Sequence, residues 1–152
     1  MISKIKSAVL LSAVLFAGAS VANNAQANTT NLDSKQIECL TLNTYKESRG
    51  ESEKGQLAVI FTVLNRVKDN RFPSTPCKVI SQKNQFSWYR KDKSVSDWST
   101  YNKVKELVKE TVAGKHRDQT QGAVFFHASR ITPSWSRSFK CTAVIGNHKF
   151  YK

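Results

Sequence analysis

Two glutamates stand four residues apart at the edge of the most apolar stretch of the chain. Glu47 and Glu51 enclose Arg49 and Gly50, and a nearly unbroken apolar run follows over residues 57–64. A carboxylic acid beside an apolar core holds its proton to a higher pH, because burial disfavours the charged form. Such an acid can protonate a poor leaving oxygen, which is what cleavage of a glycosidic bond requires. Glu47 is therefore the candidate general acid.

The pattern leaves the role of Glu51 open. A spacing of four would put both carboxylates on one face of a continuous helix, but Gly50 is expected to end the helix between them. As a second catalytic carboxylate, Glu51 would lie about 5 to 5.5 Å from Glu47 for retention of configuration, or roughly 6.5 to 9.5 Å for inversion. The alternative is a supporting role, in which Glu51 caps a helix or orients Arg49 or Arg66.

A first helix has to carry Glu47. Apolar and aromatic residues recur at spacings of three and four over residues 35–48, which predicts a helix, and Asp33 or Ser34 can cap its start. Glu47 then lies near the end of this helix, where the negative end of the helix dipole also disfavours an ionised carboxylate. Both effects favour a protonated Glu47 near neutral pH.

A second helix, predicted over residues 53–68, is apolar nearly all round from 57 to 64 and should lie at the centre of the core. The further predicted elements are a short helical turn at 77–81, a helix at about 98–113, short strands at 123–127 and 142–145, and a turn at Gly146–Asn147 leading into His148–Tyr151. The predicted fold class is α+β, mainly α, with a small β-sheet or hairpin.

Aromatic and polar side chains that could line a sugar-binding cleft gather downstream of the second helix. Rings stack on the apolar faces of sugars, while amides and hydroxyls bind their polar groups. Most aromatic residues pack in the core, but those with a polar handle favour a partly wet site. The candidate substrate-binding residues are Ser87, Trp88, His127, Asn147, His148 and Tyr151.

The three cysteines, Cys39, Cys77 and Cys141, are far apart in the sequence. In an exported protein two of them can pair, and the sequence does not choose among the three possible disulfides. The sequence contains no Cys-x-x-Cys or His-x-x-x-His spacing, and its histidines are scattered. It therefore predicts neither a metal site nor a cofactor.

The N-terminus has the pattern of a secretory signal. Lys4 and Lys6 precede an apolar stretch over residues 8–22, and Ala25–Ala27 is a small-residue cleavage site. Cleavage after Ala27 predicts an exported protein, periplasmic or secreted, without a stable membrane anchor. The expected organisation is a signal peptide at 1–27, a lead-in at 28–38 and one catalytic domain at 39–152.

The chain is strongly basic, with 24 Lys and Arg against 11 Asp and Glu. This charge suits nucleic acid, anionic lipid and acidic cell-wall polymers equally well, since it governs association rather than chemistry. One interpretation is therefore a non-catalytic cationic protein that binds the wall or perturbs membranes. A secreted nuclease is disfavoured because the sequence has no His-rich metal motif, so nucleic acid is not an expected partner.

Several short blocks follow one another along residues 39–151. They are Glu47–Glu51, Gly55–Gln56, Ala58–Val59, Val63–Val67, Phe72–Pro73, Gln85–Trp88 and Ile145–Tyr151. Together these blocks resemble the SleB-type cell wall hydrolases, a family named for a spore-cortex-lytic enzyme. The resemblance covers nearly all of the chain that follows the predicted signal.

The resemblance implies a lysozyme-like, mostly helical domain that acts on peptidoglycan glycan strands. It implies cleavage between N-acetylmuramic acid and N-acetylglucosamine, by a muramidase or a lytic transglycosylase that needs no cofactor. The first Glu of the family's Glu-x-Arg-Gly-Glu motif is the expected acid and corresponds to Glu47. The sequence departs mildly from this motif at Ser48, where the family usually has Ala. We expect the chain to act as a monomer.

Overall fold

The computed structural model describes residues 32–152. The predicted signal at 1–27 and the first residues of the predicted lead-in lie outside this range. The described residues form four α-helices, one 3₁₀ helix and one sheet of three strands. Among these helices none is long and apolar enough to cross a membrane.

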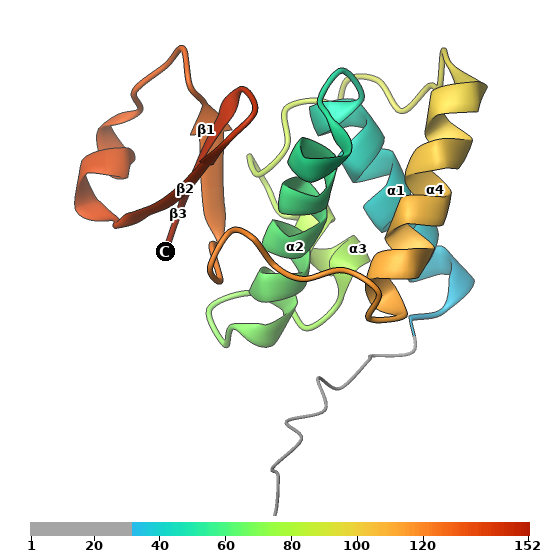
Figure 1. Cartoon of the computed structure of the whole chain (residues 1–152), viewed down its shortest axis with the longest axis horizontal. Helices are drawn as coiled ribbons and strands as arrows, with labels where there is room; N and C mark the ends of the chain where they lie inside the picture. Colours follow the sequence, from blue (N-terminus) through green and yellow to red (C-terminus); the bar gives the residue numbers. More distant parts are fainter. Residues whose placement is uncertain (1–31) are drawn as a thin grey trace, which may run out of the picture.

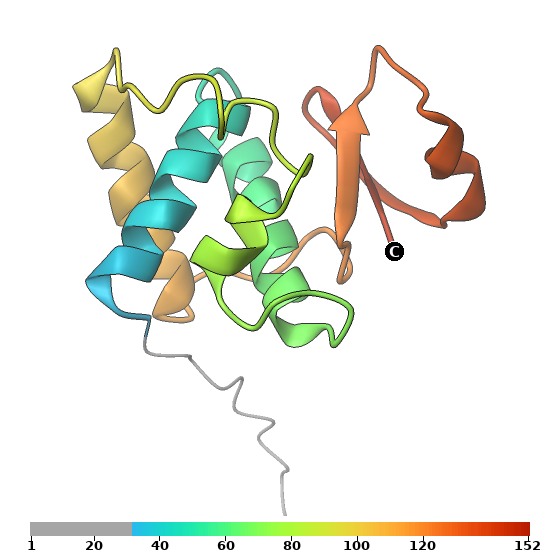
Figure 2. The same cartoon turned by 180° about the vertical axis from the view of Figure 1, so that it is seen from behind.

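The helical part is built around α2 (Glu53–Lys68). α1 (Ser34–Ser48) packs against α2, α3 (Pro76–Ser81) and α4 (Trp98–Val112). Figures 1 and 2 show α1 and α4 on one side of α2 and the sheet on the other. The central position of α2 explains why this helix is apolar nearly all round, as the sequence predicted.

Side chains cap the starts of α1 and α4, and the cap of α1 at Asp33 is one of the two candidates that the sequence predicted. Asp33 caps α1 by accepting a hydrogen bond from the N–H of Gln36 at 2.8 Å. Asp97 caps α4 by accepting one from the N–H of Thr100 at 3.0 Å. Each cap satisfies an N–H group that the first turn of a helix leaves without a partner inside the helix.

α1 ends at Ser48, but not in the way expected from Gly50. Arg49 keeps a right-handed helical conformation, and the N–H of Glu51 donates to the carbonyl oxygen of Ser48 at 2.9 Å. Gly50 does not have a positive φ, so it does not form the left-handed cap that commonly ends a helix. A tight right-handed turn ends α1 instead, and the expected glycine cap is wrong.

The main hydrophobic core lies among the helices. Its buried members are Leu40, Leu57, Ile60, Val63, Val79, Ile80, Phe86, Val104, Leu107 and Val108. α2 supplies Leu57, Ile60 and Val63, and the other helices and the loop after α3 close around them. Burial of these side chains is what holds the turn from α1 to α2 in place.

A small antiparallel sheet covers the opposite side of α2. Its strands are β1 (Phe125–Ala128), β2 (Cys141–Ile145) and β3 (His148–Tyr151), in the order β1-β3-β2, with the 3₁₀ helix η1 (Ser134–Ser138) between β1 and β2 in the chain. Ile145 and Phe150 pack with Ala58 of α2. Because neighbouring residues of a strand point to opposite faces, Lys149 and Tyr151 lie on the outer face, away from α2. The predicted fold class, α+β and mainly α, is confirmed.

Glu51 joins the helical part to the β2–β3 turn. Its side chain is 10% exposed, and both of its carboxylate oxygens lie 3.3 Å from the backbone nitrogen of Asn147, which donates to them. Gly146 makes the turn with a φ of +55°, and a Cβ at this position would collide with Oε2 of Glu51. The turn can approach the carboxylate this closely because residue 146 has no side chain.

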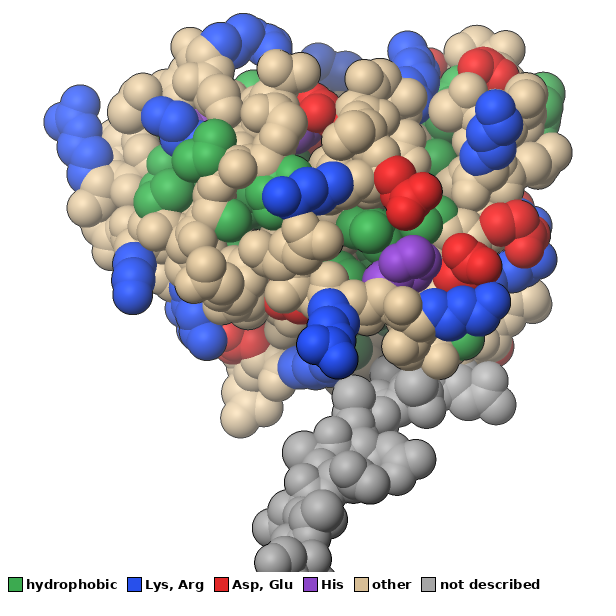
Figure 3. Space-filling model, in the orientation of Figure 1, with side chains coloured by type: hydrophobic (Ala, Val, Ile, Leu, Met, Phe, Trp, Pro, Cys, Tyr) green, Lys and Arg blue, Asp and Glu red, His purple; other side chains and the backbone are tan. Residues whose placement is uncertain are grey.

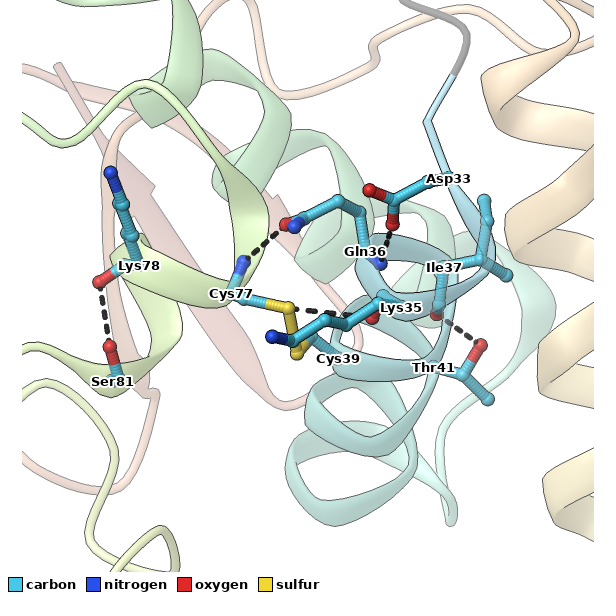
Figure 4. The surroundings of a disulfide bond; sticks show 9 residues. All are labelled: Asp33, Lys35, Gln36, Ile37, Cys39, Thr41, Cys77, Lys78 and Ser81. Atoms are coloured by element: carbon cyan, nitrogen blue, oxygen red, sulfur yellow. Dashed lines mark hydrogen bonds between the residues drawn. A yellow bond between two sulfur atoms is a disulfide. The ribbon is translucent and has the colours of Figure 1, made fainter.

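A disulfide between Cys39 and Cys77 links α1 to α3 (Figure 4), and Cys141 is exposed and unpaired. The side-chain oxygen of Gln36 also accepts a hydrogen bond from the N–H of Cys77 at 3.0 Å. α3 has only six residues, too few for a helix to be stable alone, so its position depends on these links to α1.

We predict that replacing Cys39 and Cys77 together by Ser lowers the free energy of unfolding by about 2 to 4 kcal/mol, because the cross-link restricts the unfolded chain. Urea denaturation without reductant measures the loss. Cys141→Ser removes the unpaired thiol and is the control, with an expected change below about 0.5 kcal/mol. Equal losses in the two variants would contradict a stabilising disulfide.

Gly146→Ala should lower the free energy of unfolding by about 2 to 4 kcal/mol, since left-handed backbone strain adds to the collision with Glu51. In a Glu51→Ala background the collision is gone, and the cost should fall to the backbone strain of about 1 to 2 kcal/mol. Gly50→Ala is the control, because a Cβ there meets nothing within 4 Å. The same cost of Gly146→Ala in both backgrounds would refute the contact.

Candidate active site

Glu47 occupies the last turn of α1 and is half-buried. Burial raises the pKa of its carboxyl above the ordinary value, and this is the largest influence on it. The indole N–H of Trp88 and the guanidinium of Arg66 act in the opposite direction, because both favour the ionised form. The direction of the net shift is the one predicted from the sequence, and it suits a proton donor.

Arg66 brings a buried positive charge from α2 towards Glu47. It is only 4% exposed, and its Nε donates to the carbonyl oxygen of Val124 at 2.6 Å. The guanidinium carbon also lies 5.3, 5.7 and 5.9 Å from the ring centroids of Phe72, Phe86 and Phe125. Burial lowers the pKa of Arg66 to about 10, against the attraction of Glu47, so the side chain stays charged at neutral pH.

From the sequence, Arg66 was expected only as a possible partner of Glu51, and the structure corrects this expectation. Within residues 32–152, Glu51 pairs with neither Arg49 nor Arg66, and the charge of Arg66 acts on Glu47 instead. Arg49 is exposed and lies over the ring of Tyr45, 5.2 Å from its centroid. The signal for Arg66 was its position as a lone charge inside an apolar helix, where a charge needs a partner.

Ser87 and Trp88 lie in the loop between α3 and α4. The ring of Trp88 is half-buried and packs against Phe86 and Tyr89, with centroids 6.4 and 5.7 Å apart. Its indole nitrogen is buried and makes no full hydrogen bond with any described residue, although it is close enough to favour the ionised form of Glu47. Ser87 is exposed beside it. The buried indole donor lies next to the acid and favours its carboxylate form.

Asn147 and His148 are brought to Glu51. Two hydrogen bonds fix the backbone of Asn147. Its N–H donates to Glu51, and its carbonyl oxygen accepts from the N–H of Ser129 at 2.7 Å. The side chain of Asn147 is exposed. His148 is buried, with Nδ1 3.8 Å from Oε1 of Glu51. Burial lowers the pKa of His148 below its ordinary value, although Glu51 opposes this.

His127 and Tyr151 form a separate cluster on the outer face of the sheet. Nε2 of His127 lies 2.9 Å from the hydroxyl oxygen of Tyr151, and Nδ1 lies 2.9 Å from the carbonyl oxygen of Ala128. A carbonyl oxygen only accepts, so Nδ1 carries the proton and the Tyr151 hydroxyl donates to Nε2. Trp135 of η1 packs edge-on against both rings, with centroids 5.5 Å away.

The structure therefore divides the predicted site residues into sets rather than one cluster. These are Glu47 with Ser87 and Trp88, Glu51 with Asn147 and His148, and His127 with Tyr151. Within residues 32–152, no hydrogen bond, ion pair or ring contact joins His127 or Tyr151 to Glu47. In the same range, no three His, Cys, Asp or Glu side chains gather in a way that would hold a metal ion.

The amino-acid sequence matches the family model described as Cell Wall Hydrolase over residues 50–151, a range that begins after Glu47. It is 33% identical over 119 residues to a spore cortex-lytic enzyme of Bacillus cereus, covering 76% of this chain and 44% of that protein. It is 31% identical over 121 residues to one of Oceanobacillus iheyensis, covering 76% of this chain and 41% of that protein. The chain thus spans less than half the length of these relatives.

Two solved structures resemble the fold. One is the catalytic domain of the germination-specific lytic transglycosylase SleB from Bacillus anthracis, with a TM-score of 0.70 and 28% identity, covering 81% of this chain and 98% of that domain. The other is the catalytic domain of the Bacillus cereus SleB protein, with a TM-score of 0.67 and 30% identity, covering 85% of this chain and 99% of that domain. With the fold of SleB catalytic domains and a family match from Gly50 to Tyr151, the chain belongs to the cell wall hydrolase family.

Proposed function

We propose that the chain is a peptidoglycan-degrading glycosidase with Glu47 as its single general acid and base. The observation that carries the proposal is the half-buried carboxyl of Glu47, whose pKa burial raises at the end of α1. The printed names of the similar proteins, spore cortex-lytic enzyme and lytic transglycosylase, support peptidoglycan as the substrate. We place the cleaved bond between N-acetylmuramic acid and N-acetylglucosamine.

In the first step Glu47 gives its proton to the glycosidic oxygen, and the bond to the muramyl anomeric carbon breaks. The positive charge that develops on this carbon is stabilised by the acetamido oxygen of the same sugar. Glu47 is now a carboxylate, and the charges of Arg66 and the Trp88 dipole stabilise it because they favour this form. Burial thus favours the protonated form of Glu47 that is present before the transfer, and Arg66 and Trp88 favour the carboxylate that remains after it.

In the second step the Glu47 carboxylate takes a proton from the attacking hydroxyl. Attack by the 6-hydroxyl of the muramyl sugar closes an anhydro ring and gives transglycosylation. Attack by water gives hydrolysis. We assign no second catalytic carboxylate, because the largely buried side chain of Glu51 is directed to the backbone N–H of Asn147. Glu51 instead supports the site by fixing the β2–β3 turn to the corner that follows Glu47.

The half-buried ring of Trp88, by stacking, and the exposed hydroxyl of Ser87, by hydrogen bonding, are our first candidates to bind a sugar next to the broken bond. The exposed amide of Asn147 and the ring of His148 would contact the strand from the turn that Glu51 holds. His127 and Tyr151 remain predicted substrate contacts, and they bind each other on the outer face of the sheet.

We predict that Glu47→Gln lowers the rate of release of soluble fragments from purified peptidoglycan at least about 100-fold, because an amide cannot donate the proton. Glu53→Gln, an exposed Glu in the first turn of α2, is the matched control and should keep full activity. Full activity in Glu47→Gln would remove Glu47 as the acid. Mass spectrometry of the wild-type products separates anhydromuramyl ends from reducing muramyl ends, and so transglycosylation from hydrolysis.

Trp88→Phe should shift the alkaline limb of the pH profile of kcat/KM to higher pH. The indole N–H lowers the pKa of Glu47, so its loss raises that pKa, and the acid stays protonated to a higher pH. The control is Tyr89→Phe, which keeps the neighbouring ring and should leave the limb in place. An unchanged or downward-shifted limb in Trp88→Phe would show that the indole does not act on the acid.

A further inference from the structure

Positive charge without acidic neighbours is concentrated in the part of the chain that forms the sheet and η1, residues 119–152, here called the β-lobe. All 11 acidic residues of the chain lie before residue 119. The basic residues of the β-lobe are Arg130, Arg137, Lys140, Lys149 and Lys152. The lobe therefore carries a net positive charge that no residue of its own can neutralise.

The helical part, residues 32–118, has 17 Lys and Arg against 11 Asp and Glu, a net charge of +6 over 87 residues, whereas the β-lobe has +5 over 34 residues. Every ion pair of Lys or Arg with Asp or Glu in residues 32–152 lies in the helical part, and the pairs are Lys46–Asp92, Arg71–Asp69, Lys105–Glu38, Lys109–Glu106 and Lys115–Glu110. The β-lobe cations take part in none of them. The net positive charge per residue is therefore about twice as high in the β-lobe, although the helical part also carries Lys and Arg outside these ion pairs.

Lys140 and Lys152 are held side by side. The N–H of Lys140 donates to the carbonyl oxygen of Lys152 at 3.2 Å, and the N–H of Lys152 donates to that of Lys140 at 3.0 Å. Like charges at directly opposed positions of a sheet repel each other. Hydrogen bonds from Arg71 and, to a smaller extent, the charge of Lys152 lower the pKa of Asp69, but the carboxylate of Asp69 already forms an ion pair with Arg71 at 2.6 Å. Within residues 32–152 neither lysine takes part in an ion pair, so both are available to an anion bound from outside.

Apolar groups adjoin these cations. Arg137 lies on η1 between Trp135 and Phe139, which are half-buried and whose ring centroids are 6.2 Å apart. Val144, 63% exposed, stands opposite Lys149 in the β2–β3 pairing. Cations beside exposed apolar surface suit a ligand that offers both carboxylates and the apolar faces of sugars or peptide side chains.

The β-lobe is only partly set apart from the candidate acid, because its β2–β3 turn adjoins Glu51. It lies on the other side of α2 from α1, which carries Glu47 (Figure 1). In the view of Figure 3, Lys and Arg stand out along the side that the β-lobe forms, while acidic groups gather over the helices. Among the cations of residues 32–152 only Arg66 is found to act on Glu47, so a polymer segment held by Arg137, Lys140 and Lys152 would not have to occupy the surroundings of Glu47.

We propose that Arg137, Lys140 and Lys152 of the β-lobe form a second, non-catalytic binding surface, separate from the predicted substrate contacts of the same lobe, that holds the free carboxylates of peptidoglycan peptide stems while Glu47 acts on a glycan strand. The inference rests on the proposed function, since peptidoglycan supplies the anions and the sugars in one polymer. Single exposed ion pairs are weak, but stems repeat along the strand, so several such contacts act together. Nucleic acid and anionic lipid also carry negative charge, but they offer no peptide stems.

The test measures co-sedimentation with insoluble peptidoglycan sacculi. All proteins carry Glu47→Gln so that the sacculi stay intact. The variant Arg137→Gln/Lys140→Gln/Lys152→Gln should bind about tenfold more weakly than its parent, because three charge contacts are lost. The control Lys54→Gln/Lys78→Gln/Lys103→Gln removes the same charge from exposed positions of the helical part and should lose less than about twofold.

Sacculi whose carboxylates have been converted to amides are the second probe. The parent should bind them about as weakly as the β-lobe variant binds untreated sacculi, and the two proteins should no longer differ. The proposal is overturned by equal losses in the two triple variants, by undiminished binding to amidated sacculi, or by tighter binding of the parent to duplex DNA or anionic vesicles than to sacculi.

Activity separates this inference from the proposed function. With Glu47 intact, the β-lobe variant should digest soluble glycan chains, freed of peptide and with the exposed lactyl carboxylates converted to amides, at the wild-type rate, because these chains carry no carboxylates. A wild-type protein that digests neither substrate would defeat the proposed function and leave the binding comparison readable. A β-lobe variant that fails on peptide-free glycan would instead show that the lobe serves catalysis, contrary to the proposal.

Discussion

A buried guanidinium holds together the parts of this molecule that the candidate chemistry needs. Arg66 projects from the central helix, donates at 2.6 Å to the backbone just before β1, and is surrounded by aromatic rings. Leaving such a charge alone in the interior would cost several kcal/mol, so α2, the strand and the loop after α3 have to meet around it. Glu47 then lies where this charge and its own burial act on it in opposite directions.

This opposition suits a group that must act twice. Burial alone would make Glu47 a poor base, and an unopposed positive charge would make it a poor acid. The structure supplies both influences from elements that the core has already fixed, α2 for Arg66 and the loop after α3 for Trp88. Both influences on the candidate acid thus come from side chains of residues 32–152.

Much of the fold could be predicted because it follows from local patterns. The apolar run of α2, the caps at Asp33 and Asp97 and the turn at Gly146–Asn147 are all encoded within a few residues. The position of Glu47 at the end of α1 followed from the same periodicity. Gly50 misled because a glycine permits a left-handed cap without requiring one, and here the chain closes a right-handed turn instead.

What the sequence could not supply were contacts between segments far apart in the chain. It grouped His148 and Tyr151 as one aromatic block, but residues three apart on a strand point to opposite faces, so one meets Glu51 and the other meets His127. The choice of Cys39 and Cys77 from three possible pairs depends on how α1 docks on α3. The partner of Arg66 likewise appears only when α2 is set beside α1.

The disulfide has a topological consequence. Cys39 and Cys77, 38 residues apart, close a covalent ring that contains Glu47, Glu51, Arg66 and the whole of α2. A protease that cuts one exposed bond in the turns of this ring, at 49–52 or 69–75, opens the ring without releasing either end. The acid and the helix that carries its counter-charge stay in one covalently joined molecule after such a nick.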